Sequence, residues 1–571
     1  MLKNDFSRSK LFWMLALLCF LSLFLFIGQT YFNTRGEPRE ALVGMAMLES
    51  GNWTLPITNG VDMAYKPPLF HWCIAMISSI VGEVNEYTSR MPSAIALATM
   101  VLGGFMFYAK RRSTEVAFLM GLITLTNFEV HRAGIACRVD MLLSALMVLA
   151  LYELFKWAQK QLRGIPWLGI LFLSGAFLTK GPVGMVLPCM VVGVYSLIRG
   201  TNFFRAFLSF AAVAVASIAI PMLWYVAAWR QGGDAFLNLV IEENVLRFLG
   251  KMTYASHINP WHYNVMTIVA GFVPYTILFI ISLFTIRKVK VASKPKEWWS
   301  KLTSYIKDMD DTRLFSLLSI VIMFVFYCIP KSKRSVYLLP VYPFIAYFIA
   351  EYIVYLAKNK PKVVNIYNGI LYGVGILLTV VFFVVKLGAI PHTMFHGKHA
   401  AENIAFVSAL EELPLGMNLI MILLPLVLGI VLFRARKSLT VMVYGGGIMA
   451  FALFFSLDGV FLPSILNTKS NIVIAERLKK EVPKERVYSY ITNMADGNRL
   501  HPFTVNFYMN NQVVPFEESQ PEKGVLLLGE EEYDVFIKNY GKEYALEEWP
   551  ESLYKSCDNR KMTRIYSFRK I

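Results

Sequence analysis

Long apolar runs separated by short charged segments make up most of this chain. Thirteen of the runs predict membrane-spanning helices, because a helix of about 20 apolar residues crosses the hydrocarbon core of a bilayer. These runs lie at residues 11–30, 91–109, 114–128, 139–157, 166–179, 182–198, 206–229, 263–286, 314–329, 336–357, 366–386, 417–434 and 439–460. The first is too long for the apolar part of a signal peptide, so we expect a retained helix.

A shorter apolar stretch, residues 69–82, follows Pro67 and Pro68. Its length falls below that of a span, which favours a helix that lies at the membrane surface or re-enters the membrane.

The Lys and Arg residues orient the predicted helices, because positive charge near span ends is retained in the cytoplasm. With the N-terminus inside, the inner loops hold 25 Lys and Arg residues and the longer outer loops hold 15. Residues 31–90 and 461–571 then both lie on the outer side.

The last segment differs in character from the rest of the chain. Residues 461–571 hold 16 Lys plus Arg and 16 Asp plus Glu, so the net charge of +17 belongs to the membrane part. The runs RVYSYIT, TVNFYM, KGVLLLG and TRIYSF predict strands, and IVIAERLKKEV and EEYDVFIKNYG predict helices. We therefore predict a membrane domain over 1–460 and a small outer α/β domain over 461–571.

Ionisable residues gather on the predicted outer side. Its cations oppose the usual cytoplasmic bias of positive charge, and charge near the bilayer is costly unless it is paired or used. The segment KSKR places three cations within four residues. Such a cluster is better suited to binding an anion than to snorkelling of the side chains to the membrane interface. Lipid phosphate is the anion always present at the membrane interface. The chain has no motif for binding nucleotides, and we expect no nucleic-acid partner. The outer set is Arg35, Glu37, Arg39, Glu40, Asp62, Lys66, Asp140, Lys180, His257, Lys331, Lys333 and Arg334.

Some of these residues also have simple structural explanations. Lys180, in the turn of AFLTKGPVGMVLP, could extend its amine to the membrane surface. Asp140 could cap its helix or pair with Arg138, and a lone His257 is more typical of a structural histidine.

The stretch GEPREALVGMAMLES predicts a helix beginning after Gly36, with Pro38 in its first turn. Glu37 and Glu40 then lie one turn apart on the same face, with Arg39 beside them. A solvated, self-paired surface helix would account for each of these residues taken alone.

The motifs taken in order resemble those of the family-C polyprenyl-phosphate glycosyltransferases, the group that includes protein O-mannosyltransferases and the lipid A aminoarabinose transferase. The resemblance covers about residues 10–350 and is carried by GEPREALVGMAMLESGNWTLPITNGVDMAYKPPLFHW, RMPSAIAL, RVDMLL, LTKGPVGMVLP, EENVLRF, HINPWHY and KSKRSVYLLPVYPFIA. It implies a polytopic α-helical protein of the bacterial inner membrane, with about 13 transmembrane helices and juxtamembrane helices in the first outer loop. The C-terminal α/β domain and the site would face the periplasm.

By the same resemblance, each candidate residue receives a role. Glu37 and Asp140 are the catalytic candidates. Donor phosphate would contact Arg39, Lys66, Lys180, Lys331, Lys333 and Arg334, and a cover loop or acceptor contact would come from Glu243, Asn244, Arg247 and His257.

Two departures from the family pattern bear on the chemistry. Gly36 stands where the family has the first acid of a pair, which leaves Glu37 alone. Tyr65 precedes Lys66 where the aminoarabinose transferase has a metal-binding acid. No cofactor is therefore certain, and a divalent metal ion held by Glu37 and His257 stays open.

The predicted activity is transfer of a sugar from a polyprenyl phosphate to lipid A or to a protein hydroxyl, with inversion at the anomeric carbon. Cations can stabilise the departing phosphate, and a carboxylate can take the proton of a hydroxyl acceptor. If the acceptor is a phosphate group of lipid A, which is already ionised, the reaction needs no general base. The alternative is a transporter or flippase of lipid-linked sugars, although the spans show no internal repeat and the charges lie at one face.

Overall fold

A computed structural model describes residues 8–246, 249, 251, 258–285, 303–483, 486–493 and 498–571. Contacts divide the chain into two compact units. The first comprises residues 1–26, 92–387 and 414–460, and the second comprises residues 27–91, 388–413 and 461–571. The division at residue 460 that the sequence predicts, between membrane and outer domains, stays a prediction. The contacts group the first outer loop with the C-terminal segment instead.

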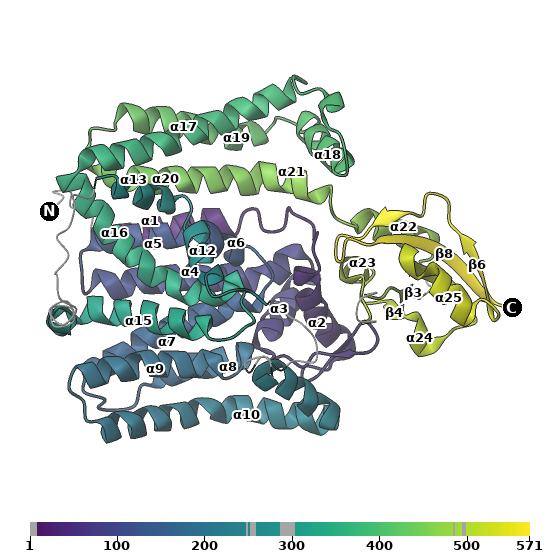
Figure 1. Cartoon of the computed structure of the whole chain (residues 1–571), viewed down its shortest axis with the longest axis horizontal. Helices are drawn as coiled ribbons and strands as arrows, with labels where there is room; N and C mark the ends of the chain where they lie inside the picture. Colours follow the sequence, from purple (N-terminus) through teal and green to yellow (C-terminus); the bar gives the residue numbers. More distant parts are fainter. Residues whose placement is uncertain are drawn as a thin grey trace. The chain divides into compact units, whose positions relative to one another are not determined.

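Among its described residues, the first unit is built of helices joined by short turns and loops, with one isolated β-bridge between Ile258 and Ser332 (Figure 1). Its helices are α1 (Arg8–Leu23), α4 (Glu86–Ala109, which begins in the second unit), α5 (Thr114–Leu125), α6 (Phe128–Gly134), α7 (Val139–Gln159), α8 (Trp167–Lys180), α9 (Val183–Ile198), α10 (Phe203–Ile241), η1 (Glu242–Leu246), α12 (Tyr263–Gly271), α13 (Tyr275–Leu283), α15 (Asp311–Cys328), η2 (Ser335–Val341), α16 (Tyr342–Asn359), α17 (Pro361–Lys386), α19 (Asn418–Arg434), α20 (Leu439–Ser456) and η4 (Leu457–Phe461).

Each of the thirteen predicted apolar runs coincides with a helix or a helix pair. Among the described residues, seven helices are long and apolar enough to cross a membrane, or eight if one bent pair counts as a span. The others are shorter, so the chain is a multi-pass helical protein and the number thirteen stays a prediction. The stretch 69–82 is helical as expected, as α3 (Leu69–Val81).

The run at 263–286 departs from the single span predicted. It forms α12 and α13, which are bent by 106° relative to each other. Pro274 stands between them as the N-terminal cap of α13, and a proline cannot continue a helix because it has no amide hydrogen.

In two parts of the first unit, helices that are close in the sequence pack against one another. Helices α7, α8 and α9 lie against one another with α10 alongside α8 and α9, and α17, α19 and α20 form a second group (Figure 1). Rings of α4, α7, α15 and α16 stack in the core, with centroids 4.2 Å apart for Phe107 and Tyr152 and 4.3 Å apart for Phe155 and Phe315.

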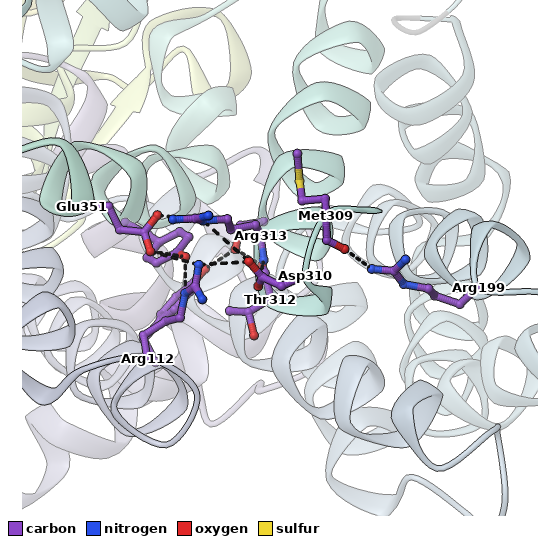
Figure 2. A network of polar contacts seen from close by, with 10 residues as sticks. Arg112, Arg199, Met309, Asp310, Thr312, Arg313 and Glu351 are labelled. Atoms are coloured by element: carbon purple, nitrogen blue, oxygen red, sulfur yellow. Dashed lines mark hydrogen bonds and ion pairs between the residues drawn. The ribbon is translucent and has the colours of Figure 1, made fainter. Parts of the chain in front are cut away.

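A network of charges ties together helix ends on the predicted inner side (Figure 2). Arg112 contacts Asp310 and Glu351, each at 3.1 Å, and Arg313 reaches Glu351 at 3.1 Å. Arg199 pairs with Asp311 at 2.7 Å. The network contains no candidate site residue, and it joins the end of α9, the start of α15 and the middle of α16 to the turn after α4.

In the second unit, the first outer loop forms α2 (Gly36–Ser50), a two-stranded hairpin of β1 (Ile57–Thr58) and β2 (Asp62–Met63), and α3. The predicted start of α2 is confirmed. Gly44 permits the close packing of α2 on α3, because a Cβ there would lie 2.7 Å from the Ile74 side chain. The loop is therefore a packed structure built on two helices.

The C-terminal part carries a mixed sheet with the strand order β4-β3-β5-β8-β6, and β7 pairs with β8. Strand β3 is parallel to β4 and β5, and β8 is antiparallel to β5, β6 and β7. The strands are β3 (Val487–Tyr490), β4 (Val513–Pro515), β5 (Lys523–Gly529), β6 (Tyr544–Glu548), β7 (Tyr554–Lys555) and β8 (Met562–Lys570). The helices of the unit beyond α3 are η3 (His392–Met394), α18 (Ala400–Glu411), α21 (Leu462–Asn467), α22 (Ile472–Glu481), α23 (Phe503–Tyr508), α24 (Phe516–Ser519), η5 (Glu530–Glu532) and α25 (Tyr533–Tyr540).

Both faces of this sheet are covered. Alternate strand residues pack with α22 and α23 on one face and with α24 and α25 on the other. One strand prediction is wrong, because TVNFYM forms α23. Its first four residues, 504–507, are all buried, so the short run does not alternate between a core and a solvent face as a half-exposed strand would.

Because the hairpin and the C-terminal sheet belong to one compact unit, they must lie on the same side of a membrane. We expect exposed positions Ile57→Cys and Val473→Cys, in a chain whose native cysteines are replaced, to react alike with an impermeant maleimide on intact cells. Tyr305→Cys, on the predicted inner side, is the control and should react only after permeabilisation. Opposite labelling of positions 57 and 473 would contradict the arrangement.

Candidate functional site

Two of the predicted phosphate-binding residues, Arg39 and Lys66, gather around one buried carboxylate in the first outer loop. Glu40 on α2 accepts hydrogen bonds from Arg39 Nη2 at 2.9 Å and from Lys66 Nζ at 2.5 Å. His71 Nε2 on α3 lies 2.9 Å from its other oxygen. The Glu40 side chain is 5% exposed, whereas those of Arg39 and Lys66 are 46% and 30% exposed. The acid points inward and the two cations remain accessible.

The electrostatics of Glu40 follow from its neighbours. Burial alone would raise the pKa of Glu40, but Lys66, Arg39 and His71 outweigh it and hold the pKa well below its ordinary value of 4.5. Glu40 is therefore an ionised anchor for cations at neutral pH.

Glu37, the first catalytic candidate, forms a two-point ion pair with Arg90. Arg90 Nε donates to Oε1 at 2.8 Å, and Nη2 donates to Oε2 at 3.1 Å. The Arg90 side chain is buried, and its Nη1 also donates to the carbonyls of Ile27 at 2.5 Å and Thr30 at 2.7 Å. The carboxylate is consequently held in one orientation.

In the first unit, Asp140 and Lys180 form an ion pair between the start of α7 and the end of α8. Asp140 is buried, and the Lys180 amine also lies 4.3 Å from the centre of the Tyr337 ring. Arg138 and Arg334 add positive charge around the same carboxylate. Asp140 therefore holds Lys180 in a cationic surrounding.

The three cations of KSKR have different surroundings. Lys331 is exposed and Arg334 lies near Asp140, whereas Lys333 is buried. The Lys333 amine donates to the carbonyls of Pro330 at 2.6 Å and Asn259 at 3.3 Å. The structure thus gives Lys333 a local backbone role beside its predicted phosphate contact.

The predicted cover loop is described in part. Glu243 and Asn244 lie on η1, and Asn244 Nδ2 donates to the Val240 carbonyl at 2.9 Å. Arg247 and His257 lie outside the described residues. Across the described part of the chain, no three His, Cys, Asp or Glu side chains form a metal-binding group.

Two members of these clusters escaped the sequence reasoning. His71 follows directly after KPPLF, and Arg90 opens RMPSAIAL, so both stand within motifs that carry the family resemblance. Their partners, Glu40 and Glu37, lie 31 and 53 residues away, and only folding brings them together.

The comparisons with known proteins agree with these motifs. Residues 65–225 match the family model described as dolichyl-phosphate-mannose-protein mannosyltransferase. The chain is 25% identical over 476 residues to an uncharacterized protein of Aquifex aeolicus, with 82% of each chain covered. It is 24% identical over 399 residues to undecaprenyl phosphate-alpha-4-amino-4-deoxy-L-arabinose arabinosyl transferase 1 of Proteus mirabilis, with 66% of each covered. For transferase 2 of that organism, the match is 28% over 363 residues and covers 61% of its length.

The same fold occurs in a solved structure, ArnT from Cupriavidus metallidurans bound to undecaprenyl phosphate. The TM-score is 0.67 at 18% identity, with 99% of this chain and 98% of the other covered. The apo state of that protein gives a TM-score of 0.68. The similarity spans the membrane helices and the C-terminal sheet together.

We expect Glu40→Gln to lower the free energy of unfolding by about 1–3 kcal/mol at pH 7, because two cations lose their buried partner. A depressed pKa stabilises the folded state above the ordinary value of 4.5 and ceases to do so as the pH falls through the folded-state pKa. The difference in thermal stability between wild type and Glu40→Gln should therefore shrink as the pH is lowered below 4.5. Glu412→Gln, at an exposed position, is the control; a difference independent of pH would contradict this account.

Proposed function

We propose that this chain, a member of the family-C polyprenyl-phosphate glycosyltransferases, transfers a sugar from a polyprenyl phosphate to an acceptor at the periplasmic face of a bacterial inner membrane. The observation that carries the proposal is the inward Glu40 with the accessible Arg39 and Lys66 beside it. A buried acid that holds two partly exposed cations is suited to receive an anion such as a lipid phosphate. The names of the relatives support a polyprenyl-phosphate donor.

The reaction is a single in-line displacement at the anomeric carbon. The bond from that carbon to the phosphate oxygen breaks, the bond to the acceptor oxygen forms, and the configuration inverts. The departing polyprenyl phosphate gains negative charge, which Arg39, Lys66 and Lys180 stabilise. Lys331, Lys333 and Arg334 supply further positive charge from the segment after α15, and Glu243, Asn244, Arg247 and His257 belong to the cover over the substrates.

The acceptor is a hydroxyl of lipid A or of a protein, and Glu37 takes its proton. Arg90 supports this role by fixing the orientation of the carboxylate, as a positioned base requires. Asp140 is the second candidate and orients the acceptor while it holds Lys180.

Within this proposal the domains divide the work. Residues 1–460 form the membrane transferase domain, and residues 461–571 form a periplasmic α/β domain. If the protein is a glycosyltransferase, the purified protein releases polyprenyl phosphate from a labelled polyprenyl-phosphate sugar and glycosylates the acceptor. A transporter of lipid-linked sugars would move the donor across a vesicle membrane without turnover.

Removal of a phosphate-binding cation should impair use of the donor. We expect Arg39→Ala and Lys180→Ala each to lower kcat/KM for the donor by roughly 10-fold to 150-fold, equivalent to about 1.5–3 kcal/mol for a charge-assisted hydrogen bond. Lys358→Ala, which removes an exposed cation on the predicted inner side, is the matched control and should retain wild-type kinetics. Unchanged kinetics in both site variants would show that these cations serve only the fold.

Replacement of the candidate base tests the acceptor chemistry. Glu37→Gln keeps the shape and one hydrogen bond to Arg90 but removes the proton acceptor, so turnover should fall by ~10²-fold to 10⁴-fold while donor binding is retained. Glu153→Gln, at an ion pair of α7 near the predicted inner side, is the control. Normal turnover by Glu37→Gln would indicate an acceptor that arrives ionised, such as a lipid phosphate, and Glu37 would then serve to hold Arg90.

A further inference from the structure

We propose that the C-terminal α/β segment, residues 461–571, positions the first outer loop through Ser470, Asn506 and Tyr508, and so holds the cation cluster of α2 in place. The positioning stands on contacts within the second unit. Its consequence for catalysis rests on the function proposed above.

The first contact fixes the extended chain before α2. Phe32 is fully buried, its amide donates to Tyr508 Oη at 3.0 Å, and its carbonyl accepts from Ser470 Oγ at 2.6 Å. Its ring packs edge-on against Phe507 with centroids 4.8 Å apart. Residues 31–33 form neither helix nor strand, so these backbone groups depend on side chains for their hydrogen bonds.

The second contact fixes the hairpin. Asn59 is buried and has a positive φ of 51°. Its backbone N–H donates to Asn511 Oδ1 at 3.0 Å. Its side-chain oxygen accepts from Asn506 Nδ2 at 2.7 Å, and its Nδ2 donates to Asp62 at 2.8 Å. Asp62 in turn lies 3.1 Å from His501 Nε2. The turn of the hairpin is therefore held by partners from more than 400 residues away in the sequence.

These contacts connect to the candidate site by short paths. The Arg90 guanidinium lies 5.1 Å from the centre of the Phe32 ring, and Arg90 orients Glu37. Tyr508 also donates to Glu86, in the same turn of α4 as Arg90. Helix α23, which carries Asn506 and Tyr508, packs against α2, which carries Arg39 and Glu40. Loss of the contacts made by Ser470, Asn506 or Tyr508 should therefore displace the side chains of α2 that we propose bind the donor.

Variants that remove single polar groups test the proposal on the full-length protein. Tyr508→Phe combined with Ser470→Ala removes both hydrogen bonds to Phe32 and keeps the buried rings, so the fold should persist. Asn59→Gly removes the side-chain hydrogen bonds to Asn506 and Asp62, keeps the backbone hydrogen bond to Asn511, and suits the positive φ at this position. Tyr544→Phe is the matched control, because it removes a tyrosine hydrogen bond to the Gln520 carbonyl inside the same sheet domain.

Hydrogen exchange measured by mass spectrometry is the first readout and does not depend on activity. In the double variant, amides of residues 27–40 should exchange roughly 5-fold to 30-fold faster, and in Asn59→Gly the increase should fall on residues 57–63. Strands β5 and β8 should exchange at wild-type rates in every variant. Unchanged exchange in the loop, or an equal increase in Tyr544→Phe, would overturn the proposal.

Donor kinetics are the second readout. The double variant should raise KM for a labelled polyprenyl-phosphate sugar roughly 10-fold with a smaller change in kcat, because the displaced groups bind the donor. A wild-type KM alongside faster loop exchange would overturn the link to the donor. Absence of turnover in the wild-type protein would refute the proposed function and leave the exchange result as the test of positioning.

Discussion

Burial of the Glu40 carboxylate is the constraint on which the first outer loop depends. A carboxylate removed from water costs several kcal/mol unless charged partners and hydrogen bonds compensate it. Its partners come from three places: Arg39 on α2, Lys66 after the hairpin, and His71 on α3. Satisfying one buried acid therefore fixes two helices and a loop relative to each other, and it leaves the cations facing outward.

The first unit also contains a buried carboxylate that is compensated by a partly exposed cation. Asp140 is buried at the start of α7, and its partner Lys180, at the end of α8, is 29% exposed. An ion pair of this kind orders the lysine side chain, so the anion binding proposed above would not carry the entropy cost of ordering a free lysine. Asp140, which the sequence marks as a catalytic candidate, is thus also the group that holds Lys180, whereas the other catalytic candidate, Glu37, pairs with Arg90.

The sequence correctly predicted those features of the fold that are determined by neighbouring residues. The apolar runs located the helices, and Gly36 with Pro38 located the start of α2. The strand prediction for TVNFYM was wrong because the fold buries this run as α23. The single span predicted over 263–286 was wrong for a local reason, because Pro274 separates α12 from α13. The number of spans is not settled by hydropathy because several helices are shorter than a bilayer is thick.

The same distinction applies to the site. Charge and motif order selected Arg39, Lys66, Asp140 and Lys180, and the structure brings these into two acid-centred clusters, one in each unit. No local signal could reveal that Glu37 pairs with Arg90.

The contacts of Phe32 with Ser470 and Tyr508 are the most distant case, since more than 400 residues separate the partners. Chain entropy opposes such contacts until the rest of the unit has folded. The positioning proposed above therefore ties the loop that carries Glu37 and Arg39 to the last segment of the chain. Under that proposal, a sheet domain with no candidate catalytic residue of its own is still a condition for an ordered site.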